Sequence, residues 1–203
     1  MKTTVSSSRS VTERVWSRLD CPGHEVFRLD STTAGWTLSG VAIGLAEHGS
    51  YAMEYKVHCD PSWRGVDVAI TGWSDRKRVD ISLARVDHAG WLMDGAECPE
   101  LAGCTDIDLS FSPSTNTSAI RRLDLAIGQS GVTSAAWLTF PALRLERLDQ
   151  EYQRTAKNVY RYSAPELAFT ADLEVDEHGV VVSYPGLWRS SAREIGEPPR
   201  AGV

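Results

Sequence analysis

The carboxylates and guanidinium groups between residues 103 and 125 are the side chains whose types and spacing could carry chemistry. Asp106 and Asp108 alternate with apolar residues, and Arg121 and Arg122 follow a polar segment. A carboxylate can act as a general acid or base, and a guanidinium can hold an anionic group through its planar fork of donors. The same residue types also form internal ion pairs. The segment therefore predicts either a structural ion pair or a site for a small anionic organic molecule.

The alternation of residues indicates where these charges point. If residues 120–127 form a strand, Arg121 shares a face with Leu123, and Arg122 lies on the opposite face. A guanidinium on the apolar side needs a carboxylate, carbonyl groups or an anionic ligand, because leaving it unpaired is costly. A β-bulge near Asn116 would reverse this parity. The strand assignment thus predicts that Arg121 is the inward-facing cation.

Motifs of nucleophilic, nucleotide-dependent and zinc-dependent enzymes do not occur in the sequence. There is no GxSxG elbow, Walker loop, GxGxxG or HExxH. His58 with Asp60, and Asp176 with His178, could each place two metal ligands on one side of a strand. Two ligands do not complete a site, and both residue types are also common at turns and strand ends. We therefore expect no metal and no cofactor.

Period-two alternation predicts that strands position these side chains. A single helical turn around residues 114–120 is the alternative for one segment, because Ser, Pro and Asn favour caps and turns there. A sheet this large curls or closes instead of staying flat. The sequence therefore predicts an all-β protein with one large curved antiparallel sheet, a half-barrel or spiral β-roll of eleven or more strands. The runs are residues 36–44, 51–59, 66–70, 79–83, 107–111, 123–127, 136–140, 143–148, 159–163, 167–175 and 180–184.

Two short internal matches raise the question of a duplication. Residues 42–44 repeat at 126–128, and residues 86–92 resemble 175–181 in the same order. Matches this short also arise by chance. If they reflect a duplication, two related β-halves share the sheet.

Composition excludes some classes of partner. The 203 residues carry 21 basic and 27 acidic side chains, a net charge of −6, which argues against nucleic-acid binding. No apolar run is long enough for a transmembrane span, and the N-terminal residues lack a secretory signal. We expect a cytoplasmic protein with free thiols, a single domain over residues 1–192 and a flexible tail over 193–203.

Several ordered motifs carry a resemblance to a known bacterial family. They are Gly103-Cys104-Thr-Asp106-Ile-Asp108, Pro113-x-x-Asn116-Thr117, Ile120-Arg121-Arg122-Leu123, Tyr55-x-x-x-Cys59-Asp60-x-x-Trp63, and Val175-Asp176-x-x-Gly179-x-Val181-x-x-Tyr184-Pro185-Gly186-Leu187-Trp188. From about residue 16 to 188 the chain resembles the family called putative glycolipid-binding. The resemblance implies a duplicated half-barrel sheet similar to periplasmic lipoprotein carriers, with a glycolipid or other amphiphile on its concave face. The family name rests on this likeness of shape.

The same resemblance suggests which side chains would read the polar head of an amphiphile. An Arg suits phosphate or carboxylate, and aromatic faces suit sugar rings. Asp106 and Asp108 would be an acid/base pair or members of ion pairs. The candidate ligand-binding residues are Trp63, Asn116, Arg121, Arg122, Tyr162, Tyr184 and Trp188.

Three functional hypotheses follow. The first is a non-catalytic binding protein for a glycolipid or similar amphiphile. The second is an enzyme that acts on a small anionic organic substrate, with Asp106 or Asp108 as base and Arg121 or Arg122 holding the anion. The third is a structural protein whose exposed sheet edges pair with another chain, as in a homodimer.

Overall fold

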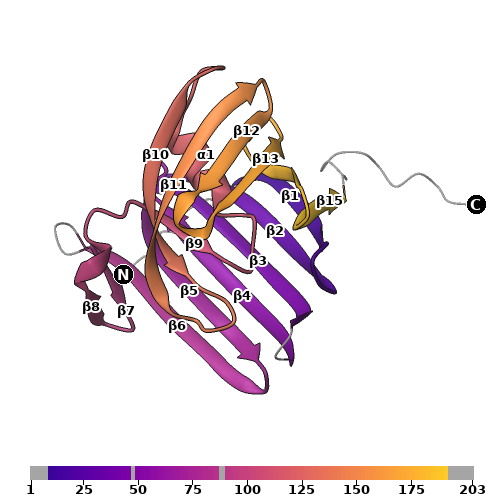
Figure 1. The fold of residues 1–203 in the computed structure, drawn as a ribbon. Helices are drawn as coiled ribbons and strands as arrows, with labels where there is room; N and C mark the ends of the chain where they lie inside the picture. Colours follow the sequence, from indigo (N-terminus) through magenta and orange to yellow (C-terminus); the bar gives the residue numbers. More distant parts are fainter. Residues whose placement is uncertain (1–8, 47–48, 87–89, 192–203) are drawn as a thin grey trace, which may run out of the picture.

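The computed structural model describes residues 9–46, 49–86 and 90–191 and consists mainly of one fifteen-stranded sheet (Figure 1). The single α-helix of the described residues is α1 (Asn116–Leu123), and two 3-10 turns are η1 (Pro99–Leu101) and η2 (Pro165–Leu167). The strands are β1 (Arg9–Arg18), β2 (Gly23–Thr32), β3 (Gly35–Ala46), β4 (Gly49–Cys59), β5 (Gly65–Ser74), β6 (Lys77–Val86), β7 (Gly90–Met93), β8 (Ala96–Cys98), β9 (Asp106–Leu109), β10 (Ser130–Leu138), β11 (Leu145–Ala156), β12 (Val159–Ala164), β13 (Phe169–Val175), β14 (Val181–Tyr184) and β15 (Trp188–Ser191).

The sheet is built outward from a central pairing of β1 with β15. Its order is β8-β7-β6-β5-β4-β3-β2-β1-β15-β14-β13-β12-β11-β10-β9. All neighbours are antiparallel except β9 and β10, which run parallel. The predicted fold class, one large curved sheet in an all-β protein, is therefore confirmed.

The sheet curves so that its two arms face each other across the core. In Figure 1, β1–β6 form a broad wall and β10–β13 curl over it, with α1 between the two. The first five residues of α1, Asn116–Ile120, are buried in this hollow. The backbone N–H of Gly65 donates to Thr105 O at 3.0 Å and joins the start of β5 to the segment before β9. The core is thus on the concave side.

Close packing on this side depends on a glycine opposite a tyrosine. Gly40 of β3 pairs with Tyr55 of β4. A Cβ at Gly40 would lie 2.7 Å from the Tyr55 hydroxyl, so only glycine lets the ring lie across the neighbouring strand. The Tyr55 hydroxyl can therefore reach the centre of the core.

The predicted strand over residues 123–127 is wrong. Residues 116–123 form α1, which ends at Asp124 in a left-handed conformation, and no strand begins before Ser130. The three alternating apolar residues are too few to specify a strand, and the buried first turns of the helix decide the conformation. Because Arg121 lies in a helix, strand alternation does not place its side chain on the apolar face.

The comparison of the two halves does not support the first internal match. Residues 42–44 belong to β3, whereas residues 126–128 lie in the connection between α1 and β10. The second match includes residues 87–89, which lie outside the described residues, as does the predicted tail, 193–203.

All four cysteines are free, as predicted. Within the described residues, no helix is long and apolar enough to cross a membrane.

Candidate functional site

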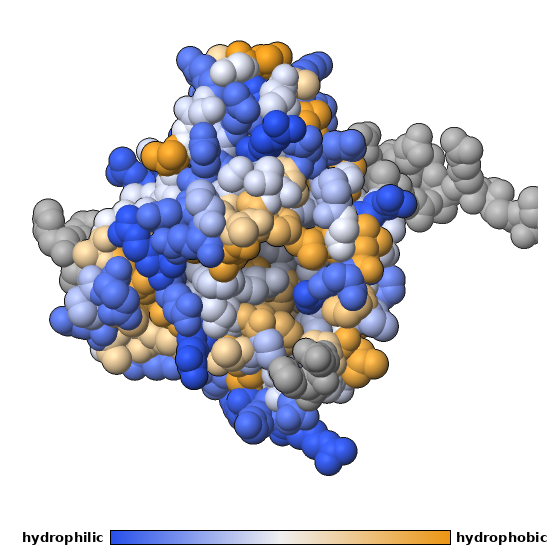
Figure 2. All heavy atoms as spheres, viewed as in Figure 1, coloured by the Kyte–Doolittle hydropathy of each residue, from blue (hydrophilic) through white to orange (hydrophobic). Residues whose placement is uncertain are grey.

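A cavity of about 200 Å³ opens on the concave side, where the second arm of the sheet meets α1. Figure 2 shows a face of the molecule that is hollowed near its middle, with apolar side chains around the hollow. We call the cavity beside α1 the aromatic cavity. It is lined by Asp108, Leu109, Ser110, Ser112, Asn116, Trp137, Leu148, Tyr162, Leu167, Phe169, Tyr184, Leu187 and Trp188.

Strand alternation buries one face of each strand beside the cavity, and Leu148 of β11 and Tyr162 of β12 line it. On β11, Leu148, Gln150 and Tyr152 are buried, while the residues between them are exposed. On β12 the same alternation buries Tyr160 and Tyr162. Consecutive strands thereby deliver polar and aromatic groups to one place.

The wall contains five aromatic side chains. Tyr162, Phe169 and Tyr184 form a cluster with ring centroids 6.0 to 6.3 Å apart. Trp188 lies at the edge of the cluster and has the guanidinium of Arg18 5.2 Å from its ring centroid. Tilted and edge arrangements of this kind are the favoured aromatic geometries. They give the cavity large apolar ring surfaces.

Asp108 is the charged group of the wall. Gln150 Nε2 donates to its Oδ2 at 2.6 Å, and the same nitrogen lies 3.1 Å from the Tyr162 hydroxyl. Burial raises the pKa of Asp108 to about 6, against the opposing effect of the Gln150 hydrogen bond. Burial and the charge of Asp108 also raise the pKa of Tyr162 and Tyr184. At neutral pH the cavity therefore contains a carboxylate beside neutral phenols.

A second buried carboxylate lies behind the cavity. Glu25 is fully buried, and its Oε1 accepts hydrogen bonds from the Tyr55 hydroxyl and, at 2.7 Å, from Ser112 Oγ. Burial raises the pKa of Glu25 to about 8. Its other oxygen has no partner among the described residues. Because Ser112 also lines the cavity, this network connects the cavity to the wall formed by β2 and β4.

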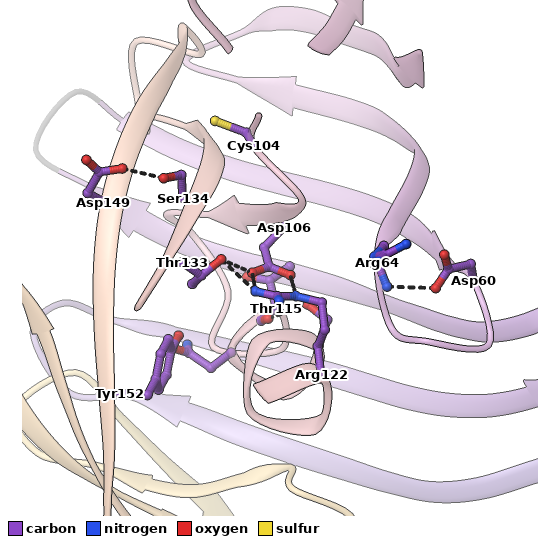
Figure 3. Close-up of polar contacts among 12 residues, drawn as sticks. Asp60, Arg64, Cys104, Asp106, Thr115, Arg122, Thr133, Ser134, Asp149 and Tyr152 are labelled. Carbon is purple, nitrogen blue, oxygen red and sulfur yellow. Dashed lines mark hydrogen bonds and ion pairs between the residues drawn. The ribbon is translucent and has the colours of Figure 1, made fainter. Parts of the chain in front are cut away.

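The predicted ion pair exists, but it involves Arg122 and not Arg121. Arg122 binds Asp106 through two hydrogen bonds of 2.9 and 2.6 Å, and Thr133 also donates to Asp106 (Figure 3). Asp106 is 1% exposed. The hydrogen bond to Asp106 raises the pKa of Arg122, although burial opposes it. The pair ties α1 to β9 and β10.

Arg121 and Trp63 lie together outside the aromatic cavity. The Arg121 side chain is exposed at the end of α1, and its guanidinium lies 5.6 Å from the Trp63 ring centroid. Trp63 itself stacks on Trp36, with ring centroids 4.2 Å apart. The structure therefore separates the sequence candidates. The cavity gathers Asp108, Asn116, Tyr162, Tyr184 and Trp188 but not Trp63, Arg121 or Arg122.

Members of both His–Asp pairs have structural partners within the fold. His58 Nδ1 lies 2.6 Å from Asp67, and Asp60 accepts backbone N–H groups within its own turn. Asp176 forms a 2.5 Å ion pair with Arg14. The described residues contain no group of three or more His, Cys, Asp or Glu side chains arranged to hold a metal.

Sequence reasoning missed Gln150 and Glu25. Both occupy positions that alternate with apolar residues: Gln150 lies between Leu148 and Tyr152, and Glu25 precedes Phe27 by two residues. A polar residue at a buried position of an amphipathic strand was the available signal.

Comparison with known proteins identifies the family. The family model described as "Putative glycolipid-binding" matches residues 13–190. The chain belongs to this family. The predicted resemblance is thus confirmed, and the motif residues Asp108, Asn116, Tyr184 and Trp188 of this member of the "Putative glycolipid-binding" family meet in one cavity.

A crystal structure of a DUF1089 family protein from Pseudomonas aeruginosa is similar to this chain. The two chains are 30% identical, with a TM-score of 0.70, and the match covers 93% of this chain and 95% of that one. No curated protein matches the sequence.

Proposed function

We propose that the protein binds an amphiphile with a sugar-containing head without chemical conversion, and that the head occupies the aromatic cavity. The observation that carries this proposal is the combination of five aromatic side chains and one carboxylate around a single cavity. Binding sites typically combine apolar walls with a few polar groups that fix orientation. Aromatic faces and hydrogen-bonding groups suit the apolar faces and the hydroxyls of a sugar ring.

The size of the cavity supports a binding mode in which the head of the amphiphile lies inside the cavity and its tail lies outside. Sites for drug-sized ligands usually have about 300 to 1,000 Å³, whereas this cavity has about 200 Å³. It suits one ring-sized head and cannot hold a whole glycolipid. Leu167, which is 48% exposed, Phe169 and Leu187 would then contact the first part of the tail. Each methylene that they cover contributes about 0.8 kcal/mol.

The alternative of an enzyme with an Asp and Arg pair gains no support. Asp106 and Arg122 bind each other, and Arg121 lies over Trp63. Neither guanidinium lines the cavity that contains Asp108. An anionic substrate at Asp108 would therefore lack the cation that this mechanism requires.

Titration of delipidated protein with octyl β-glucoside below its micelle concentration tests the proposal. We expect saturable binding, followed by calorimetry and native mass spectrometry, and a stabilisation that rises with ligand concentration. Phe169→Ala removes one aromatic face of a partly buried residue and should weaken binding about tenfold. Trp73→Ala removes an exposed aromatic side chain on β5 and is the matched control.

Two results would reject the proposal. One is the absence of glucoside binding by the delipidated wild-type protein. The other is an unchanged affinity in folded Phe169→Ala protein, which would show that the ligand binds elsewhere.

A further inference from the structure

We infer that the aromatic cavity selects amphiphiles with uncharged or amine-bearing sugar heads and rejects heads that carry a phosphate, sulfate or carboxylate. This inference rests on the proposed function and names the class of head that the cavity accepts.

The charge in the cavity wall has one sign. Among the residues that the structure describes, Asp108 is the only charged side chain that lines the cavity. An anionic head would therefore face a carboxylate with no cation to offset it, and like charges at close range disfavour binding strongly.

Arg122 and Arg18 are engaged in other contacts. Arg122 is held by Asp106. Arg18 is near the Trp188 ring, but its guanidinium donates to Asp20 at 2.8 and 3.0 Å and to the Tyr51 hydroxyl at 3.0 Å. Recruiting either guanidinium for an anionic head would break these hydrogen bonds.

The polar groups of the wall have capacity for hydroxyl and amine donors. The hydrogen bond that Asp108 accepts is from Gln150 to Oδ2, and no described residue donates to its Oδ1. Ser110 Oγ is buried without a partner among the described residues. A buried polar atom left unpaired costs free energy. Sugar hydroxyls, which both donate and accept, would satisfy Asp108 and Ser110 together.

Three ligands with one tail isolate the head. Octyl β-glucoside, its 2-amino analogue and octyl β-glucuronide differ only in charge-bearing groups on the ring. At pH 7.5 we expect the first two to bind at least about tenfold more tightly than the glucuronide, measured by calorimetry below the micelle concentration.

A matched pair of variants assigns the selection to Asp108. Asp108→Asn keeps the shape of the side chain and removes its charge, so the preference for glucoside over glucuronide should fall below about threefold. Asp172→Asn makes the same change at an exposed carboxylate on the opposite face of β13 and should leave the preference unchanged.

The outcomes separate this inference from the proposed function. Equal binding of all three ligands, or tighter binding of the glucuronide, overturns the head selection while amphiphile binding stands. A preference that survives in Asp108→Asn also overturns it. If none of the three ligands binds, both the head selection and the proposed function are rejected.

Discussion

Glu25 shows how one buried carboxylate can link pH to the stability of the whole fold. In the unfolded chain its carboxyl has an ordinary pKa near 4.5, and in the folded protein burial raises this pKa to about 8. Between these values the folded protein keeps a proton that the unfolded chain releases. Stability from this group is therefore fully present below about pH 4.5 and is lost as pH rises through 8.

Glu25→Gln should remove this pH dependence. The amide mimics the protonated carboxyl and can still accept hydrogen bonds from Tyr55 and Ser112. Relative to wild type, its free energy of unfolding should increase by about 2 kcal/mol between pH 6 and 8.5. Asp108, whose pKa is raised to about 6, also lowers the stability as pH rises, but its contribution is common to both proteins and cancels in the comparison.

Urea unfolding of both proteins across this pH range makes the measurement, and an exposed substitution, Glu146→Gln, is its control. A wild type and a Glu25→Gln variant with parallel pH profiles would show that Glu25 is ionised in the folded state.

At the scale of elements, the docking of α1 depends on the ion pair between Arg122 and Asp106. Arg122→Ala should lower the free energy of unfolding by about 3 to 5 kcal/mol, because Asp106 stays buried without its cation and keeps only the hydrogen bond from Thr133. Arg161→Ala breaks an exposed pair with Asp172 and should cost less than about 1 kcal/mol. Chemical denaturation compares the two variants. Equal losses would contradict the structural role of the buried pair.

The elements also show how far the sequence alone could go. Period-two alternation located most strands because each buries one face. It missed β2. In that strand the buried face includes the charged residue Glu25 beside Phe27, and the exposed face includes the apolar residue Val26, so apolar and polar residues do not alternate in the sequence. It misassigned the end of α1 because Leu123 and Leu125 alternate by chance, whereas tertiary packing sets the helix.

The candidate site was predictable only in part. The types of side chain at Asp108, Tyr162 and Tyr184 suggested a binding role, but strand pairing between distant segments brings them together. Arg121 and Arg122 are adjacent in sequence, and the helix sends one to solvent and the other to Asp106. Assigning them correctly required knowing that the segment is helical.

At the scale of the whole molecule, one continuous open sheet forms both arms of the fold. Pairing of β1 with β15 joins the arms along one line, and the hydrogen bond from Ser112 to Glu25 joins them across the core. The cavity lies on the arm formed by β9–β15, and Ser112, one of its lining residues, lies in the connection between β9 and α1. A ligand head in this place would therefore contact the second arm of the sheet directly and the first arm through Ser112.

A crystal structure of the protein with octyl β-glucoside is the most direct test of the central claim. We expect the sugar to lie among Tyr162, Tyr184 and Trp188, within hydrogen-bond distance of Asp108, with the octyl chain leading out past Leu167. A glucoside bound at any other place, with the aromatic cavity filled only by water, would contradict it.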